Sequence, residues 1–332
     1  MTDSAVEMIL LPEDDAMHAV EEASNFNESA YYNFFDRSRR AGGWVRIGNR
    51  PNEGTQDVLL VAYDPDGAIT VARSKRDEPT NTDRLEVGGA SYACEAPLER
   101  WRLTCDAGAV RLPNPRLLLG EEGPRPERTR LTFELAFDMC QPPAELNSEG
   151  PDETVEHVSR LASGHFEQSG RVTGVIDGEP FEGRGFRDKS WGTRDWSAPE
   201  LYRWLPMPFG DDLAMNVFIV GFGGQVVHGG WAWKDGALHR IGDPVVDTVF
   251  GEDGRTQESV DLSFSVDGER LELHGDVLNV AHVPYPVDGQ LALLNEGLAR
   301  WRLGDREALG IAECLHQLPE AGLPEPVRAL FA

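Results

Sequence analysis

The alternation of hydrophobic and polar positions predicts a chain built mainly from short antiparallel strands. Over residues 128–139, apolar side chains occupy every second position; they are Leu131, Phe133, Leu135, Phe137 and Met139. This pattern is typical of a strand with one face in a core and the other in solvent. Further short strands are predicted at residues 44–48, 57–63, 69–73, 170–176, 225–233, 259–266 and 271–277.

Turn-forming pairs separate several of these strands. An aspartate followed by a glycine, a strong signal for a hairpin, occurs at Asp66-Gly67, Asp177-Gly178, Asp235-Gly236 and Asp267-Gly268. Strands at this spacing, with little helix between them, indicate barrels or sandwiches. The fold class that we expect is therefore mainly β, with two consecutive antiparallel β-barrel domains.

The composition of one segment predicts where these domains meet. Residues 141–154 are rich in Pro, Glu, Ser and Gly and contain almost no large apolar side chain. Such a segment is typical of a connection between domains. We expect a first β domain at 41–150 and a second at 151–332.

Residues 1–40 are expected to form a short helical N-terminal segment. Helices are predicted at 13–23 and 29–40, and in the second of these Tyr32 and Phe35 stand at helical spacing. The aromatic residues here are expected to pack as a lid or plug.

The charge of the chain excludes two classes of partner. The 332 residues carry a formal net charge of −26, although the hydrophobic content of 40% is ordinary for a globular protein. A strongly acidic surface repels phosphate backbones and anionic membranes. We expect no nucleic acid among the partners and no electrostatic binding to membranes.

Cysteine usage and the N-terminus favour a cytoplasmic protein. The four cysteines match no zinc or redox spacing and are expected to be free thiols, although Cys94 and Cys105 could meet across a hairpin. Residues 1–15 are acidic and lack the features of a signal peptide. No apolar run approaches the roughly 20 residues that a membrane-spanning helix needs, so we expect no integral membrane segment.

Candidate chemistry is concentrated in residues 183–196. This segment holds two groups of charged residues between glycines and tryptophans, and five of the eight tryptophans lie between Trp191 and Trp233. Aromatic walls with a few charged groups are typical of a pocket for a mostly apolar ligand. Alternatively, the segment is a structural ion-pair network with the tryptophans in the core. The charged candidates are Arg187, Asp188, Lys189, Arg194 and Asp195.

No strong cofactor or metal signature is present. The chain has no glycine-rich phosphate loop, no Gly-x-Ser-x-Gly elbow and no His-Glu-x-x-His pair. We therefore expect neither a cofactor nor a metal. His228 is a candidate ligand-binding residue, because it alternates away from Trp231 and has small neighbours, Gly230 and Ala232; a solvent-facing histidine is the alternative.

Residues 187–196, Arg-Asp-Lys-Ser-Trp-Gly-Thr-Arg-Asp-Trp, and the preceding 165–174, His-Phe-Glu-Gln-Ser-Gly-Arg-Val-Thr-Gly, carry a family resemblance. They are similar to AttH-like lipocalin proteins and to carotenoid 1,2-hydratase (hydroxyneurosporene synthase). Kievitone hydratase belongs to the same superfamily, and tocopherol cyclase and certain fungal Diels-Alderases are similar in fold. The resemblance implies two lipocalin-like β-barrels side by side. It also implies a ligand of the isoprenoid or polyketide-like class that is hydrated, cyclised or simply bound.

One residue departs from the family pattern, which usually reads Asp-His-x-Trp-Gly. Lys189 stands at the position of the His. If that His is the proton donor of the hydratases, Lys189 is a poor acid near neutral pH unless burial lowers its pKa. Acid chemistry would then belong to Asp188, Asp195 or Glu167, or it would be absent.

The function that we expect is a cofactor-independent hydratase, cyclase or isomerase acting on a hydrophobic, isoprenoid-like substrate. A carboxylic acid kept protonated by apolar surroundings would protonate an alkene or epoxide, and tryptophan rings would stabilise the carbocation. Asp188, Asp195 and Lys189 are the catalytic candidates. The expected substrate-binding residues are Trp191, Trp196, Trp231, His228, Arg187, Arg194 and Glu167. A lipid carrier without turnover, and a structural or interaction protein, are the alternatives.

Overall fold

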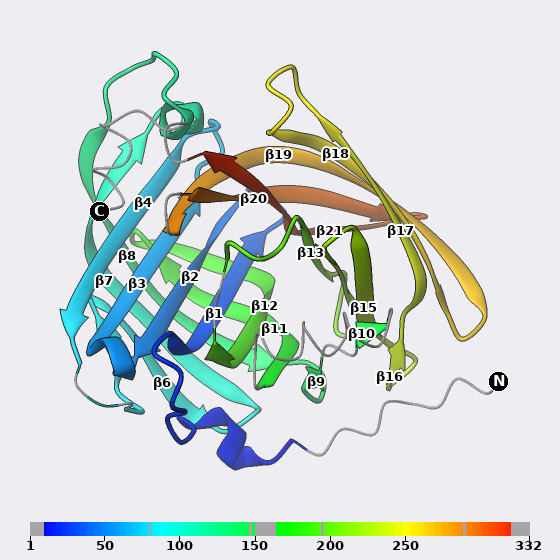
Figure 1. Ribbon diagram of the computed structural model, residues 1–332, viewed down its shortest axis with the longest axis horizontal. Helices are drawn as coiled ribbons and strands as arrows, with labels where there is room; N and C mark the ends of the chain where they lie inside the picture. Colours follow the sequence, from blue (N-terminus) through cyan, green and yellow to red (C-terminus); the bar gives the residue numbers. More distant parts are fainter. Residues whose placement is uncertain are drawn as a thin grey trace.

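The protein is described here by a computed structural model, which covers residues 10–78, 80, 82–145, 148–149, 164–193, 196–287 and 290–319. It is 71% strand and 4% helix. The strands form two antiparallel sheets that lie side by side, as Figure 1 shows. The predicted fold class, mainly β with two lipocalin-like halves, is confirmed.

The first sheet has 11 strands and closes on itself. Its strand order is β4-β3-β2-β1-β12-β11-β8-β7-β6-β5, with β9 beside β11, and β4 also pairs with β7 so that the strands from β4 to β7 form a barrel. The strands are β1 (Phe26–Asp36), β2 (Ala41–Arg50), β3 (Thr55–Tyr63), β4 (Ile69–Asp77), β5 (Leu85–Val87), β6 (Ala90–Ala96), β7 (Arg100–Leu112), β8 (Glu127–Met139), β9 (Ala144–Glu145), β11 (Gly164–Ile176) and β12 (Glu179–Thr193).

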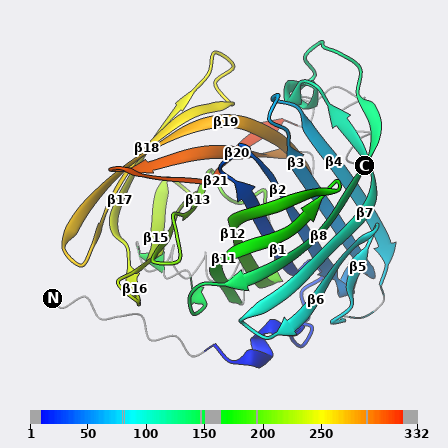
Figure 2. The ribbon, with the colours of Figure 1, turned by 180° about the vertical axis from the view of Figure 1, so that it is seen from behind.

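The second sheet has ten strands and curves round its own core, as the reverse view in Figure 2 shows. Its order is β10-β15-β14-β13-β21-β20-β19-β18-β17, and β16 pairs with β15. The strands are β10 (Ser148–Glu149), β13 (Leu201–Pro208), β14 (Leu213–Phe222), β15 (Gln225–Lys234), β16 (Ala237–Arg240), β17 (Gly242–Phe250), β18 (Gln257–Val266), β19 (Glu269–Val287), β20 (Gln290–Leu303) and β21 (Arg306–Pro319).

Strands β11 and β12 follow the predicted domain boundary near residue 150 but belong to the first sheet. Apart from the short β10, the chain passes to the second sheet only between β12 and β13. The division into domains at 41–150 and 151–332 stays a prediction. The strands themselves change from the first sheet to the second after β12, near residue 193.

The helix predicted at 29–40 is wrong. Strand β1 lies between β2 and β12, and all its residues are buried. A central strand that is covered on both faces needs no polar face, so aromatic residues on adjacent positions imitate a helical spacing. The helix predicted at 13–23 is reduced to one 3₁₀ turn, η1 (Pro12–Asp15). The remaining 3₁₀ turns are η2 (Pro51–Glu53) and η3 (Pro115–Leu119).

The predicted strands and hairpins are present. At three of the Asp-Gly pairs both residues have positive φ, for example 50° at Asp177 and 83° at Gly178, as the tight type I′ turn requires. All four cysteines are free. Among the described residues, no helix is long and apolar enough to cross a membrane.

Three main cores result from the alternation of side chains. One fills the first barrel and includes Tyr32 and Trp101, and another lies inside the curve of the second sheet around Trp301. The third, which we call the inter-sheet core, joins residues of both sheets, among them Tyr31 and Trp204. Residues next to one another along a strand therefore serve different cores.

Candidate functional site

Strand β12 carries the charged segment that the sequence singled out. Arg187 lies opposite Tyr32 of the barrel core, whereas Asp188 lies opposite Tyr31 of the inter-sheet core. Because successive side chains of a strand point to opposite faces, the segment is divided between two environments. Arg187, Lys189 and Trp191 face the interior of the first barrel, and Phe186, Asp188 and Ser190 face the second sheet.

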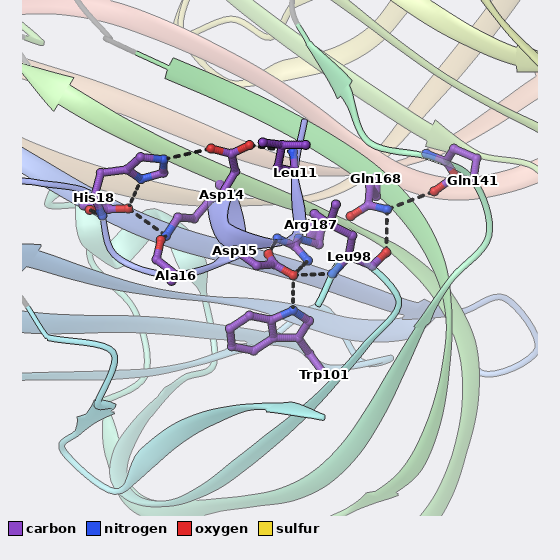
Figure 3. A network of polar contacts seen from close by, with 12 residues as sticks. Leu11, Asp14, Asp15, Ala16, His18, Leu98, Trp101, Gln141, Gln168 and Arg187 are labelled. Carbon is purple, nitrogen blue, oxygen red and sulfur yellow. Dashed lines mark hydrogen bonds and ion pairs between the residues drawn. The ribbon is translucent and has the colours of Figure 1, made fainter. Parts of the chain in front are cut away.

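Inside the barrel, Arg187 holds the N-terminal segment through Asp15 (Figure 3). Both side chains are 2% exposed. The Asp15 carboxylate also accepts hydrogen bonds from the backbone N–H of Leu98 and from Trp101 Nε1, the latter at 3.2 Å. Burial alone would raise the pKa of Asp15, but the charge and hydrogen bonds of Arg187 hold it below its ordinary value.

Lys189 is part of the same closure. Its Nζ lies 2.8 Å from Glu28 Oε1 and donates to the carbonyl of Ala16 at 3.0 Å. His18 Nδ1 lies 2.7 Å from the same Glu28 oxygen, and its ring stacks on Trp191 at 3.7 Å. Burial lowers the pKa of Lys189, and Glu28 opposes this effect. Lys189 is thus paired inside the barrel, on the opposite face of β12 from Asp188.

On the other face of β12, Glu167, Asp188 and Tyr31 lie in one row across β11, β12 and β1. Glu167 is fully buried and is held by donors from the second sheet. Its Oε1 accepts from Trp204 Nε1 at 2.6 Å, and its Oε2 accepts from Asn216 Nδ2 at 2.7 Å and from Trp231 Nε1 at 2.8 Å. Burial raises the pKa of Glu167 to about 7, with the charge of Asp188 adding to it.

His165 completes this side of the site. Its Nε2 lies 2.6 Å from Asp188 Oδ2 and 3.6 Å from Glu167 Oε1. These three residues bring ligand atoms within 4.8 Å of one another and are the group, among the described residues, that could hold a metal ion. The Glu167 oxygens, however, already accept three N–H groups, and His165 and Asp188 hydrogen-bond to each other. The geometry is satisfied by hydrogen bonds within the protein.

The second sheet contributes two more buried carboxyl groups. Glu296 on β20 lies directly opposite Glu313 on β21, and Glu313 lies opposite Trp204 on β13. Burial and the nearby charge of Asp188 raise the pKa of Glu296 to about 8, and burial with the charge of Glu296 raises the pKa of Glu313 well above its ordinary value. Neighbouring carboxylates in such a place cannot both be ionised.

We call these groups the inter-sheet acid cluster: Glu167, Asp188, Glu296 and Glu313, with His165 and Tyr31. In the part of the chain that the structure describes, no arginine or lysine forms an ion pair with Glu167, Glu296 or Glu313. The walls are aromatic. Tyr31 stacks on Trp44 at 5.7 Å and meets Trp204 edge-on at 5.5 Å.

Comparison with known proteins places the chain in a family. A family model described as a domain of unknown function, DUF7064, matches residues 11–318. The chain belongs to the DUF7064 family. No curated protein matches it.

Solved structures show the fold that this DUF7064 protein shares. An AttH-like protein from Nitrosomonas europaea is 13% identical with a TM-score of 0.62, over 93% of this chain and 96% of the other. Kievitone hydratase from Nectria haematococca is 10% identical with a TM-score of 0.51, over 91% and 93% of the two chains. CghA is 11% identical with a TM-score of 0.51, over 89% and 88%. The fold that the sequence resemblance implied, two lipocalin-like β halves shared with these proteins, is confirmed.

The DUF7064 structure brings only some of the predicted site residues together. Asp188, Glu167 and Trp231 meet in the inter-sheet acid cluster. Trp196 packs against Tyr202 and Tyr285 elsewhere in the inter-sheet core. Arg187, Lys189 and Trp191 lie inside the first barrel, His228 lies on the opposite face of β15 from Trp231, and Arg194 and Asp195 lie outside the described residues.

Sequence reasoning missed Tyr31, His165, Trp204, Asn216, Glu296 and Glu313. A signal for the last two was present. Glu296 stands in phase with Leu294 and Leu298 along β20, and Glu313 stands in phase with Ile311 and Leu315 along β21. An acidic residue on the apolar phase of a strand predicts a buried carboxyl group.

Proposed function

We propose that this protein is a cofactor-independent hydratase, cyclase or isomerase that acts by acid catalysis on a hydrophobic, isoprenoid-like small molecule at the inter-sheet acid cluster. One observation carries the proposal: buried carboxyl groups from both sheets lie among aromatic rings, and no arginine or lysine among the described residues pairs with Glu167, Glu296 or Glu313 to keep it ionised. A carboxyl group of this kind keeps its proton near neutral pH and can donate it to a substrate.

The second sheet supplies the acid in this proposal. Glu296 is the donor, because its pKa of about 8 leaves it protonated at neutral pH yet able to lose the proton in turnover. Burial and the charge of Asp188 keep the Glu296 carboxyl neutral. Glu313 lies directly across the strand pair, and the loss of the Glu296 proton would disfavour its ionisation.

The first sheet supplies the proton acceptor. Asp188 and His165 share a hydrogen bond of 2.6 Å and are partly exposed, at 21% and 16% of their side chains. They can receive a proton from a substrate or a water molecule and exchange it with solvent. The rings of Trp204 and Trp231 face the same cluster. A desolvated cation over such a ring gains on the order of 2 kcal/mol.

The structural neighbours support the fold and the type of chemistry, not the substrate. One is by name a hydratase. At 10–13% identity the likeness does not identify the molecule on which this chain acts. The isoprenoid class remains part of the proposal.

The test begins with the ligand. Native mass spectrometry of freshly purified protein would detect a co-purifying lipid, and that lipid with a panel of isoprenoid alkenes would then be incubated with the protein in D2O. Hydration adds one D2O to the product, and isomerisation or cyclisation replaces hydrogen on carbon by deuterium. Glu296→Gln is expected to lower the rate by about 100-fold or more while binding is kept.

Glu134→Gln, an exposed glutamate on β8 whose side chain is 66% exposed, is the matched control and should react like the wild type. Tight binding of a lipid with no deuterium in any product would instead identify a carrier. That result would contradict the proposed reaction.

A further inference from the structure

The two ends of the first barrel differ. The barrel is the ring β4-β3-β2-β1-β12-β11-β8-β7, closed by the pairing of β4 with β7. A barrel of about eight strands has an interior that side chains can fill or that can hold one small ligand. At one end, the N-terminal segment is anchored by Asp15 on Arg187, and Met17 packs against the barrel core. A ligand of this barrel would therefore enter from the other end.

That other end holds a cavity of about 310 Å³, which we call the barrel mouth. Every strand of the ring contributes to its lining. It lies at the end of the barrel where β1, β3 and β11 finish and where β2, β4 and β12 begin. The apolar lining residues with side chains on the inner face are Phe34, Leu60, Ala62, Leu131, Phe133, Ile176 and Phe181.

The floor of the barrel mouth is aromatic. Phe34 lies edge-on to Phe133 at 5.7 Å and to Phe181 at 5.8 Å between ring centroids, and all three are buried. Nearer the ends of their strands, Ala62 on β3 and Ile176 on β11 pack against the barrel core but are partly exposed. These two strands stand opposite each other in the ring. Apolar side chains left half covered around a cavity are typical of a site for a hydrophobic ligand.

The charged side chains around the barrel mouth are largely engaged within the protein. Arg111 pairs with Asp64 at 3.1 Å and with Asp66 at 2.5 Å. Asp36 and Asp177 each accept a hydrogen bond from a backbone N–H at 2.8 Å. A charged ligand group would have to lose its hydration and compete with these contacts, whereas an uncharged ligand leaves them in place.

An anionic head group is disfavoured for a second reason. Burial raises the pKa of Asp64, and the charges of Asp66 and Asp177 add to this effect, although Arg111 opposes it. The whole chain carries a formal net charge of −26. A carboxylate or sulfonate is repelled from an opening in such a field.

We propose that the barrel mouth is a second ligand site, which binds one compact, uncharged hydrophobic molecule against Phe34, Phe133 and Phe181. Small-molecule pockets range from roughly 300 to 1,000 Å³. This cavity is at the small end of that range, so a molecule of a few rings fits it better than a long acyl chain. Strand β1 separates the site from the inter-sheet acid cluster, because Phe34 faces the barrel core and Tyr31 faces the inter-sheet core.

A pair of fluorescent probes tests the size and charge of the ligand. N-Phenyl-1-naphthylamine is uncharged, and its emission rises in apolar surroundings. 8-Anilino-1-naphthalenesulfonate has the same rings and adds a sulfonate. We expect saturable one-to-one binding of the uncharged probe, with Kd at least about 10-fold weaker for the sulfonate. In competition, 1-methylnaphthalene should displace the uncharged probe at lower concentration than 1-naphthylmethylamine, which is an ammonium ion at neutral pH.

Two variants place the probe in the barrel mouth. Ala62→Phe and Ile176→Trp narrow the cavity from opposite walls, and each should weaken binding of the uncharged probe at least about 10-fold, because the added ring takes the space of the ligand. Val249→Phe is the matched control, since Val249 is 47% exposed on β17 of the second sheet, and it should bind like the wild type. Urea unfolding verifies that each variant is folded.

Three results would overturn the inference. They are unchanged binding in both narrowed variants, tighter binding of either charged compound than of its uncharged counterpart, and no binding by the wild-type protein.

Turnover in D2O separates this site from the proposed reaction. Ala62→Phe should react like the wild type, and Glu296→Gln should bind the uncharged probe like the wild type. Loss of turnover in both Ala62→Phe and Ile176→Trp would make the barrel mouth part of the reaction site and would overturn the inference of a second site. Probe binding that depends on Ala62 and Ile176, with no turnover of any compound, would keep the barrel mouth site and contradict the proposed reaction.

Discussion

Replacing Glu296 by glutamine tests whether the proposed acid is protonated at neutral pH. The folded protein raises the pKa of Glu296 from its ordinary value of 4.5 to about 8. Between these values the unfolded chain has lost the proton and the folded protein keeps it. Because the folded protein binds more protons, its stability falls as the pH rises through this window.

The size of this loss of stability follows from the shift in the pKa of Glu296. One pKa unit corresponds to about 1.4 kcal/mol, and about 2.5 units separate pH 4.5 from pH 7, so Glu296 alone lowers the free energy of unfolding by about 3 kcal/mol over this range. Glutamine has nearly the same shape and no proton to lose. Glu296→Gln should match the wild type near pH 4.5 and exceed its stability by about 3 kcal/mol at pH 7.

The assay is urea unfolding followed by tryptophan fluorescence at several pH values between 4.5 and 8. Glu167 also has a raised pKa and shifts both proteins in the same direction. The charge of Glu296 contributes to the raised pKa of Glu313, so the two proteins are compared at pH 7 and below, where Glu296 keeps its proton. The exposed Glu134→Gln should follow the wild type throughout. A wild-type to Glu296→Gln difference that stays within about 0.5 kcal/mol at every pH would refute the reasoning and with it the choice of Glu296 as acid.

Two further substitutions test the frame that holds the site. Asp15→Asn leaves Arg187 buried without its counter-ion and should cost about 3–5 kcal/mol in urea unfolding. Breaking the exposed pair at Asp211 with Arg171→Met should cost far less. Similar costs for the two variants would contradict the structural role of Asp15. Gly185→Ala puts a methyl group 1.7 Å from the carbonyl oxygen of Asn33 and should cost at least about 3 kcal/mol. Gly108→Ala, with nothing within 4 Å, should stay within about 0.5 kcal/mol by the same measurement.

The strands could be predicted from the sequence wherever one face of the strand is buried and the other is exposed to solvent. The alternation at 128–139 and the Asp-Gly turns depend on local chemistry that the sequence states directly. Strand β1 could not be read in this way, because both of its faces are buried and Tyr31 and Tyr32 enter different cores. Its sequence is largely apolar but lacks the alternation of apolar and polar residues that marks a half-buried strand.

Only those residues of the site that lie close together in the sequence could be predicted. Asp188 and Glu167 were found because they flank one hairpin, and the alternation of β12 already separates Asp188 from Arg187. Glu296 and Glu313 reach Asp188 through the packing of one sheet on the other, and a single sequence does not state which strands become neighbours.

Both faces of β12 carry residues with a defined role, and this limits where insertions and deletions can occur in members of this family. Removing or adding one residue between Gly185 and Gly192 would shift the register and exchange the two faces of the strand. Arg187 and Lys189 would then point at the carboxyl groups between the sheets and would ionise them by pairing, while the N-terminal segment would lose both of its anchors. Insertions and deletions among relatives should accordingly fall in the turn at Asp177 and not within this stretch.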